Sequence, residues 1–216
     1  MFSRLFYRQN EKIILLFLSG LYLLISSLYP LFNHPKKFTF YFGIFLDNFV
    51  PFTPYWIIPY IIWYAYIPLV GFIIFLNNRK FYLKLILSFN IGVLICFVIY
   101  SIFQTTVPRP DVIGTDIFSQ LVRIIYKNDL PYNCFPSIHV LTTYLCMKVI
   151  KKVEEIKKNL KIFFIIIGWL INLSTLFVKQ HVFLDLVSGI LLATLVFNLV
   201  SGLVERFYSV EAKSKC

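Results

Sequence analysis

The feature that most constrains the fold is a series of long apolar runs separated by short basic segments. A helix needs about 20 apolar residues to cross the hydrocarbon core of a bilayer. Because lipid offers the backbone no hydrogen-bond partners, such runs are expected to be helical. The sequence therefore predicts an all-α, polytopic membrane helical bundle with about six transmembrane helices. The expected spans are Ile13–Phe32, Tyr55–Leu76, Leu85–Gln104, Ser137–Lys152, Ile162–Val178 and Val182–Val204.

Composition excludes two other classes of protein. Of the 216 residues, 59% are hydrophobic and only 14% are charged, which is too little polar surface for a soluble domain of this size. We therefore expect one integral-membrane domain over residues 1–216. The net charge of +11 does not indicate a nucleic-acid partner, because the basic residues punctuate the apolar runs and form no stripe. The four cysteines lack paired spacing, so neither a disulfide framework nor a zinc site is predicted.

The distribution of lysine and arginine predicts the orientation. Most of these residues lie before the first apolar run, in the segments 77–84 and 148–161, and in the tail Glu205–Cys216. All three of these later segments are expected to be polar loops or tails. Because positively charged loops stay in the cytoplasm, both termini are expected inside a multi-pass protein of the cell membrane.

Two segments on the opposite, extracytoplasmic side are expected to touch the membrane surface. Lys36–Tyr55 is rich in aromatic residues, which favour the interface between lipid and water. The long loop Thr105–Pro136 contains the stretch Asp116–Asp129, whose apolar residues fall on one helical stripe. We expect a short surface helix there, more simply explained as an anchor than as a lid.

The strongest candidate for a reactive pair is His181 with Asp185, at the junction of the last two apolar runs. Residues four apart share one face of a helix, so their side chains can meet. A carboxylate in that place holds an imidazole in one tautomer and stabilises its cation, as in a catalytic triad. A carboxylate at the start of an apolar run is also costly, and such residues are usually functional. A helix-capping Asp beside a polar interfacial His is the simpler alternative.

Two other polar stretches are expected at the same outer face. Pro136 and Ser137 suit the start of a helix, which places His139 in its first turn. The free backbone N–H groups and the helix dipole at such a position suit a phosphate. Arg109, between two prolines, can present a forked and permanently charged donor to phosphate oxygens. The apolar runs and the charge bias alone place Arg109, His139, His181 and Asp185 at the same face of the membrane. This agreement favours one shared site.

Together these stretches resemble the type 2 phosphatidic acid phosphatase superfamily, which includes polyprenyl-diphosphate phosphatases, vanadium haloperoxidases and inositol-phosphoceramide synthase-like enzymes. Its pattern is Lys, six residues and Arg-Pro; then Pro-Ser-x-His; then Ser-Arg, five residues, His, three residues and Asp. The first and second motifs match at Arg109 and at 136–139. The third matches at Ser174, His181 and Asp185.

Two positions depart from that pattern. Ile102 stands where the family has its lysine, and Thr175 stands where it has the arginine of the third motif. Such departures are similar to those of the superfamily's phosphotransferase-like branch. Lys179 is either a substitute cation or a lysine that extends its ammonium to the interface.

The resemblance implies a metal-independent lipid phosphatase without a cofactor. His181 would attack phosphorus to form a phosphohistidine, with Asp185 orienting it and His139 serving as acid and then as base. The implied substrate is a lipid phosphate or a polyprenyl diphosphate in the bilayer, with no protein partner. The expected site residues are His181, His139 and Asp185 for catalysis, and Arg109, Ser137 and Lys179 for binding phosphate.

Three other functions stay open. A lipid headgroup phosphotransferase of the inositol-phosphoceramide synthase type would use the same histidines with a different acceptor. A catalytically inactive relative that binds lipid is favoured by the missing cations and opposed by the intact His, His and Asp. A transporter with a polar pocket would also hold ionisable residues between spans, but the polar residues here cluster at one face.

Overall fold

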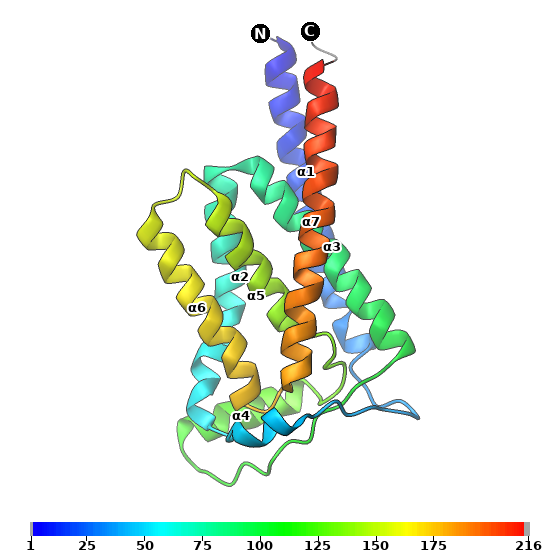
Figure 1. Cartoon of the computed structure of the whole chain (residues 1–216), viewed down its shortest axis with the longest axis vertical. Helices are drawn as coiled ribbons and strands as arrows, with labels where there is room; N and C mark the ends of the chain where they lie inside the picture. The colour runs from blue at the N-terminus through cyan, green and yellow to red at the C-terminus, as the bar shows by residue number, and fades with distance from the viewer. Residues whose placement is uncertain (1, 214–216) are drawn as a thin grey trace.

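A computed structural model describes residues 2–213 of the chain, with the surroundings of the side chains from Glu11 to Ser209. Within these residues the structure contains α-helices, short 3-10 turns and isolated β-bridges, and no β-sheet (Figure 1). The α-helices are α1 (Phe2–Ser27), α2 (Ile57–Asn77), α3 (Arg79–Ile102), α4 (Ile117–Asn128), α5 (Ile138–Lys152), α6 (Lys158–Phe177) and α7 (Phe183–Lys213).

The predicted class, an all-α polytopic membrane bundle, is confirmed. Among the described residues, the helices α1, α2, α3, α6 and α7 are long and apolar enough to cross a membrane, which makes five candidate spans. The remaining expected span, Ser137–Lys152, corresponds to α5, which is helical but has only 15 residues. A helix of that length falls short of the hydrocarbon core.

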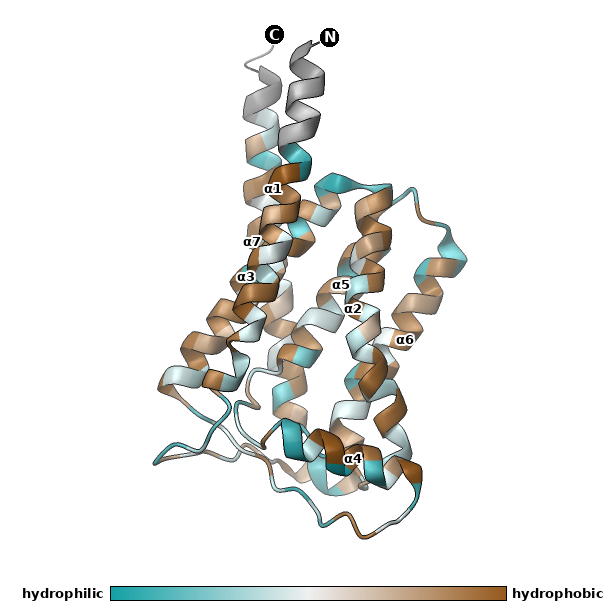
Figure 2. Ribbon diagram, turned by 180° about the vertical axis from the view of Figure 1, so that it is seen from behind, coloured by the Kyte–Doolittle hydropathy of each residue, from teal (hydrophilic) through white to brown (hydrophobic). Residues whose placement is uncertain are grey.

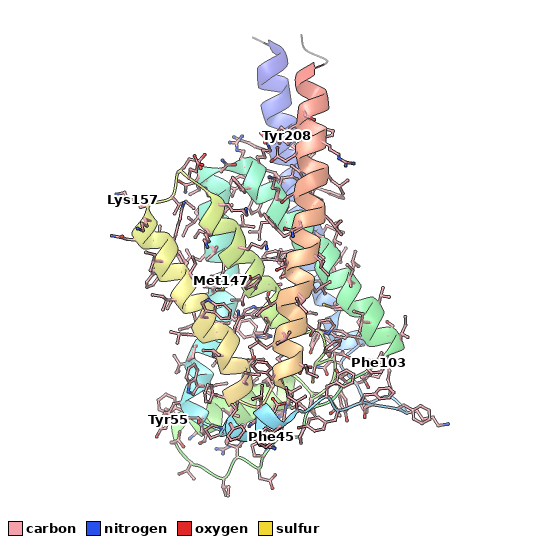
Figure 3. All side chains as sticks on the ribbon, viewed as in Figure 1. Phe45, Tyr55, Phe103, Met147, Lys157 and Tyr208 are labelled. Carbon is pink, nitrogen blue, oxygen red and sulfur yellow. The ribbon has the colours of Figure 1, made fainter. Side chains whose placement is uncertain are left out.

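The packing of α5 explains why it can be short. It contacts α2, α3, α6 and α7, so other helices surround it where lipid surrounds a peripheral span. Its side chains from Val140 to Ile150 are mostly buried, and Figure 3 shows Met147 in the middle of the bundle. Because neighbouring helices enclose α5, its length does not have to match the thickness of the bilayer. It has only to reach from the core of the bundle to the site at its first residue.

Three predicted loops are largely helical. In the segment 77–84 only Asn78 separates α2 from α3. Its side chain accepts a hydrogen bond from the N–H of Phe81 and so caps the start of α3. The segment 148–161 is non-helical only at 153–157, between α5 and α6. The expected tail continues α7 as far as Lys213, and its last residues, 214–216, lie outside the described residues.

Two lysines of the segment 77–84 pair with helix α7. Glu205 lies 2.6 Å from the ammonium of Lys84 and also contacts that of Lys80. The exposed carboxylate therefore bridges two lysines of α3 and draws the two helices together. The start of α3 lies toward the end of the bundle from which α1 and α7 project, as Figure 1 shows.

The opposite end of the bundle holds α4, the segment 29–56 and the first turns of α5 and α7 (Figure 1). The predicted amphipathic helix is confirmed, and Figure 2 shows polar and apolar sides on α4. Its apolar stripe packs on Ile57, Tyr60 and Val178, so it faces protein more than lipid. Figure 3 places Phe45 and Tyr55 at this same end, and both side chains are exposed.

Candidate active site

A chain of three side chains joins the starts of α5 and α7. The hydroxyl oxygen of Ser137 lies 2.9 Å from Nε2 of His181, and Nδ1 of His181 lies 3.3 Å from Oδ2 of Asp185. A proton on Nδ1 pointing at the carboxylate leaves the Nε2 lone pair facing the serine hydroxyl. The predicted pair His181 and Asp185 is therefore in contact, and Nε2 is the nitrogen available to a substrate.

The turn between α6 and α7 holds His181 in place. The carbonyl of Thr175 accepts hydrogen bonds from the backbone N–H groups of Gln180 and His181, at 3.0 and 3.1 Å. The Asp185 carboxylate, which is only 1% exposed, also accepts a 2.9 Å bond from the N–H of Val182. It thus caps the first turn of α7 and orients the imidazole at the same time.

The start of α5 lies against this turn. Ser137 is the N-cap residue of α5, and its own N–H donates to the carbonyl of Asp185 at 3.3 Å. The N–H groups of Ile138 and His139 have no intrahelical partner at such a position. By contrast, at the start of α7 carboxylates already accept hydrogen bonds from the N–H groups of Val182 and Phe183. The start of α5 is therefore the one prepared for an anion.

His139 lies in an aromatic enclosure. Its ring stacks on Tyr60 at 4.6 Å between centroids and lies 3.9 Å from the ring of Trp63. Its centroid is 6.5 Å from that of His181, and its Nε2 is buried without a hydrogen-bond partner. Two imidazoles at this separation leave room for one tetrahedral group between them.

Arg109 approaches from the loop before α4. Its guanidinium donates to the backbone carbonyls of Tyr126 and Asp129, at 3.3 and 2.8 Å, and to the side-chain oxygen of Gln180. It also lies 4.3 Å above the ring of Tyr126. Its Nε–H remains buried without a partner. Arg109 therefore ties α4 to the turn that carries His181 and keeps an unused donor.

Lys179 and the two departures from the family pattern lie differently. The ammonium of Lys179 donates to the carbonyls of Asp47 and Val50, so it fastens a neighbouring segment and is not part of the serine, histidine and aspartate chain. Ile102 is 83% exposed on the outer side of α3. Thr175 is fully buried, with its hydroxyl bonded to the carbonyl of Asn172. Neither position carries a cation to the site.

Three residues that sequence reasoning missed support the site. Gln180 is buried beside His181 with its amide nitrogen unpartnered. Asp47 accepts hydrogen bonds from the N–H groups of Phe183 and Ile44. Asp129 accepts from the hydroxyl of Tyr29 at 3.0 Å and from an amide, and burial raises the pKa of its carboxyl. None of them belongs to a local motif, so only tertiary structure reveals them.

A cavity of about 750 Å³ begins at this cluster. Gln180, His181 and His139 line its polar end, and the remainder is formed mainly by apolar and aromatic side chains of α1, α2 and α3. Its walls include both Leu15 and Ser26 of α1. Since a helix rises 1.5 Å per residue, the cavity runs for about 16 Å along α1. It therefore has room for a long apolar chain whose polar end meets the histidines.

The bundle and this cluster define a class of protein, a membrane protein built around a histidine that can accept a phosphoryl group. A family model described as the PAP2 superfamily matches residues 30–199, more than half of the chain. The chain therefore belongs to the PAP2 superfamily, a family of phosphatase-type phosphoryl transfer, and the predicted resemblance to this superfamily is confirmed. Comparisons with curated proteins and with solved structures found no match.

Proposed function

We propose that the protein is a membrane lipid phosphatase, which hydrolyses a lipid phosphate or polyprenyl diphosphate through a phosphohistidine on His181. One observation carries the proposal: two buried nitrogens without hydrogen-bond partners line the apolar cavity together with His181. They are Nε2 of Gln180 and Nε2 of His139, and Gln180 is held by Arg109, whose own Nε is also buried without a partner. Buried polar groups without partners are costly in a folded protein, and a phosphate supplies acceptors for them.

The first chemical step follows from the tautomer of His181. Its Nε2 lone pair attacks phosphorus while the bond from phosphorus to the lipid oxygen breaks. The positive charge that develops on the ring is stabilised by Asp185 at Nδ1. The departing oxygen takes its proton from His139, whose imidazolium form is favoured by the bound phosphate anion. The unused donors and the N–H groups at the start of α5 stabilise the equatorial oxygens.

The second step regenerates the enzyme. His139, now neutral, removes a proton from a water molecule, whose oxygen attacks the phosphorus of the phosphohistidine. The bond between nitrogen and phosphorus breaks, and inorganic phosphate leaves. Because the nucleophile and the acid are both imidazoles, the cycle is complete without a metal ion. Activity is accordingly expected to survive EDTA.

The roles of the predicted phosphate ligands are revised in this proposal. Ser137 keeps its expected part, because its hydroxyl is within reach of both Nε2 of His181 and an equatorial oxygen. Arg109 contributes Nε and fixes the amide of Gln180. Gln180 takes the place that we expected for Lys179, whose ammonium is engaged elsewhere.

The placement in the membrane extends the proposal. The site lies at the end of the bundle opposite to the termini (Figure 1). Together with the positive-inside rule, this arrangement supports a multi-pass protein of the cell membrane with cytoplasmic termini and an extracytoplasmic site. The substrate's tail would then lie in the cavity along α1, and its phosphate would reach the histidines from within the bilayer.

Trapping the phosphoenzyme tests this function. With a labelled, activated aryl phosphate, whose leaving group needs little protonation, His139→Ala should still form the phosphohistidine and then fail to hydrolyse it. An acid-labile, base-stable label should therefore accumulate in His139→Ala and be absent from His181→Ala. Label that appears in the His181 variant, or no turnover of any lipid phosphate by the wild type, would refute the proposal.

A second candidate function is transfer of the phosphorylated headgroup to a lipid alcohol. The observation that favours it is the loss of two cations, since Ile102 points outward and Thr175 is buried. A pocket with fewer charges holds a phosphomonoester dianion less tightly and suits a phosphodiester. Incubation with labelled phospholipid and a lipid alcohol separates the two: hydrolysis releases water-soluble label, and transfer produces a new labelled lipid.

A further inference from the structure

The site contains one unpartnered atom that a phosphate cannot satisfy. Oδ1 of Asp185 is buried without a hydrogen-bond partner, and it is an acceptor, whereas the unpartnered nitrogens of Gln180 and His139, which line the cavity with His181, can donate. An ionised phosphate carries only acceptor oxygens, so it cannot donate a hydrogen bond to Oδ1 of Asp185. The natural partner for a buried, unpaired carboxylate oxygen is a cation or a donor.

A thiol lies next to this carboxylate. One ligand atom from each of Cys134, His181 and Asp185 lies within 4.8 Å of the others. Cys134 is 3% exposed and lines the same cavity as His181. Its backbone is fixed because its N–H and that of Phe135 both donate to the hydroxyl of Thr105. The thiol is therefore held beside the reactive pair, although it has no part in the chemistry described above.

We propose that Cys134, His181 and Asp185 form a binding site for a thiophilic divalent cation such as Zn²⁺ or Cd²⁺, and that occupation of this site switches the enzyme off. Cysteine thiolate, imidazole and carboxylate are all zinc ligands, with bonds of about 2.0–2.3 Å. Such bonds place neighbouring ligand atoms of a tetrahedral ion about 3.3–3.5 Å apart. The Nδ1 and Oδ2 atoms of His181 and Asp185 already lie at 3.3 Å. The thiol of Cys134 lies within 4.8 Å of a ligand atom of each of these two residues.

The charge balance also suits a divalent ion. A thiolate, a carboxylate and a neutral imidazole together neutralise a 2+ charge, which makes a buried complex less costly than one with a net charge. The two positions where the family pattern carries cations are Ile102 and Thr175 here, so neither repels a metal ion. Asp129, in the loop after α4, adds a negative charge near Cys134, and the guanidinium of Arg109 adds a positive one.

The switch follows from proton accounting. When the ion binds, the thiol of Cys134 loses its proton to solvent. The ion takes the Nδ1 lone pair of His181, so the ring proton moves from Nδ1 to Nε2. A protonated Nε2 has no lone pair for phosphorus. The metal therefore blocks formation of the phosphohistidine, and the metal-free protein is the active form. The coordination itself does not depend on the proposed reaction, whereas the inhibition rests on it.

Cadmium titration of the full-length protein in detergent tests the site. All variants carry Cys216→Ser, because a terminal thiol would bind the probe by itself. The ultraviolet charge-transfer band of a cadmium–thiolate bond should appear in this parent and in Cys146→Ser, a matched buried cysteine of α5. It should disappear in both Cys134→Ser and Cys134→Ala. Affinity in Asp185→Asn should fall at least about 100-fold, since loss of a supporting partner alone costs up to that much.

The activity arm separates the two proposals. Zn²⁺ should inhibit turnover of an aryl phosphate by the parent and leave Cys134→Ala active, and EDTA should reverse the inhibition. A band that survives in both Cys134 variants, or no band in the parent, overturns the metal site. Cys134-dependent binding in a protein without phosphatase turnover would sink the proposed function and leave the metal site standing. Full activity at saturating metal would overturn the switch.

Discussion

Asp47 accepts a hydrogen bond of 2.8 Å from the backbone N–H of Phe183, which lies 136 positions later in the chain. The other carboxylate oxygen of Asp47 accepts from the N–H of Ile44 at 2.7 Å. The carboxylate therefore caps α7 and fixes its own loop at once. His181 and Asp185 flank Phe183. The segment Lys36–Tyr55, which the sequence predicts to be interfacial, therefore also supports the turn that carries His181.

Removing this cap is expected to loosen the turn. Asp47→Ala should lower the free energy of unfolding by about 0.5–2 kcal/mol, the usual cost of losing an N-cap. Activity on an aryl phosphate should fall mainly through kcat, because the imidazole is less well oriented. Asp47→Asn keeps one acceptor oxygen and should be intermediate. Thermal unfolding in detergent and steady-state kinetics measure both effects, and the exposed Glu154→Ala is the control. Equal kcat in Asp47→Ala and wild type would contradict the idea.

Replacing Asp185 tests its role in orienting the imidazole. Asp185→Asn should fold, because its side-chain oxygen can still cap the N–H of Val182. The same oxygen faces Nδ1 of His181, so the variant loses the negative charge that stabilises the imidazolium while it keeps the cap. We expect kcat to fall by roughly 10²–10⁴-fold. A variant with a wild-type melting temperature and nearly wild-type kcat would show that Asp185 serves only the helix.

Gln180 provides a test of phosphate binding. Gln180→Glu keeps the acceptor that faces Arg109 and replaces the unpartnered donor by an acceptor. A hydrogen bond to a charged group contributes about 1.5–3 kcal/mol, so kcat/KM should fall by roughly 10–150-fold. Gln180→Ala should fall less, because it adds no negative charge. The exposed Gln120→Glu on α4 is the charge-matched control. Equal losses of kcat/KM in Gln180→Glu and Gln120→Glu would show that the added negative charge lowers activity wherever it is placed, and not through a lost contact with phosphate.

The parts of the fold that could be predicted are those with local signals. Apolar runs indicated the long helices, and the four-residue spacing of His181 and Asp185 placed them in contact. The start of α3 had a readable signal in Asn78, a favoured N-cap residue before a helical stretch. The basic segment 77–84 is nevertheless predicted as a loop, because its charged residues interrupt the apolar pattern. Their partner, Glu205, lies on the distant helix α7.

The site was predictable only in outline for a similar reason. The residues within the motifs occur in short fixed spacings, so His139, His181 and Asp185 stood out. Gln180 and Cys134 have no distinguishing neighbours, and their importance comes from atoms brought together by the packing of α5 against α7. Lys179 looked like a substitute cation by proximity alone. Its ammonium instead contacts the carbonyls of the segment 47–50, which no local pattern reveals.

The orientation in the membrane can be measured by labelling introduced cysteines in a Cys216→Ser background. Asp111→Cys lies at the end of the bundle that carries the site, and Glu154→Cys lies in the turn between α5 and α6. A membrane-impermeant maleimide should label the first from outside intact cells. The second should react only after permeabilisation, because the basic segments are expected in the cytoplasm. Labelling of Glu154→Cys in intact cells would reverse the topology and move the site to the cytoplasmic face.

The carboxyl of Asp129 makes stability depend on pH. Burial raises its pKa in the folded protein, although its hydrogen bond from Tyr29 opposes the rise. A raised carboxyl pKa means that the folded state binds its proton more tightly than the unfolded chain. The contribution to stability is therefore greatest below the unfolded value of about 3.9 and is lost as the pH rises through the folded value.

Asp129→Asn keeps the neutral form of this side chain at every pH. Relative to this variant, the wild type should lose thermal stability as the pH rises from about 4 toward neutrality. The difference in melting temperature isolates Asp129 from the other titratable groups, which both proteins share. A gap that stays constant across this range would show that Asp129 is ionised throughout. If the melting temperature of the wild type instead rises relative to that of the variant, the hydrogen bonds from Tyr29 and Asn33 outweigh burial and hold the pKa of Asp129 below its usual value.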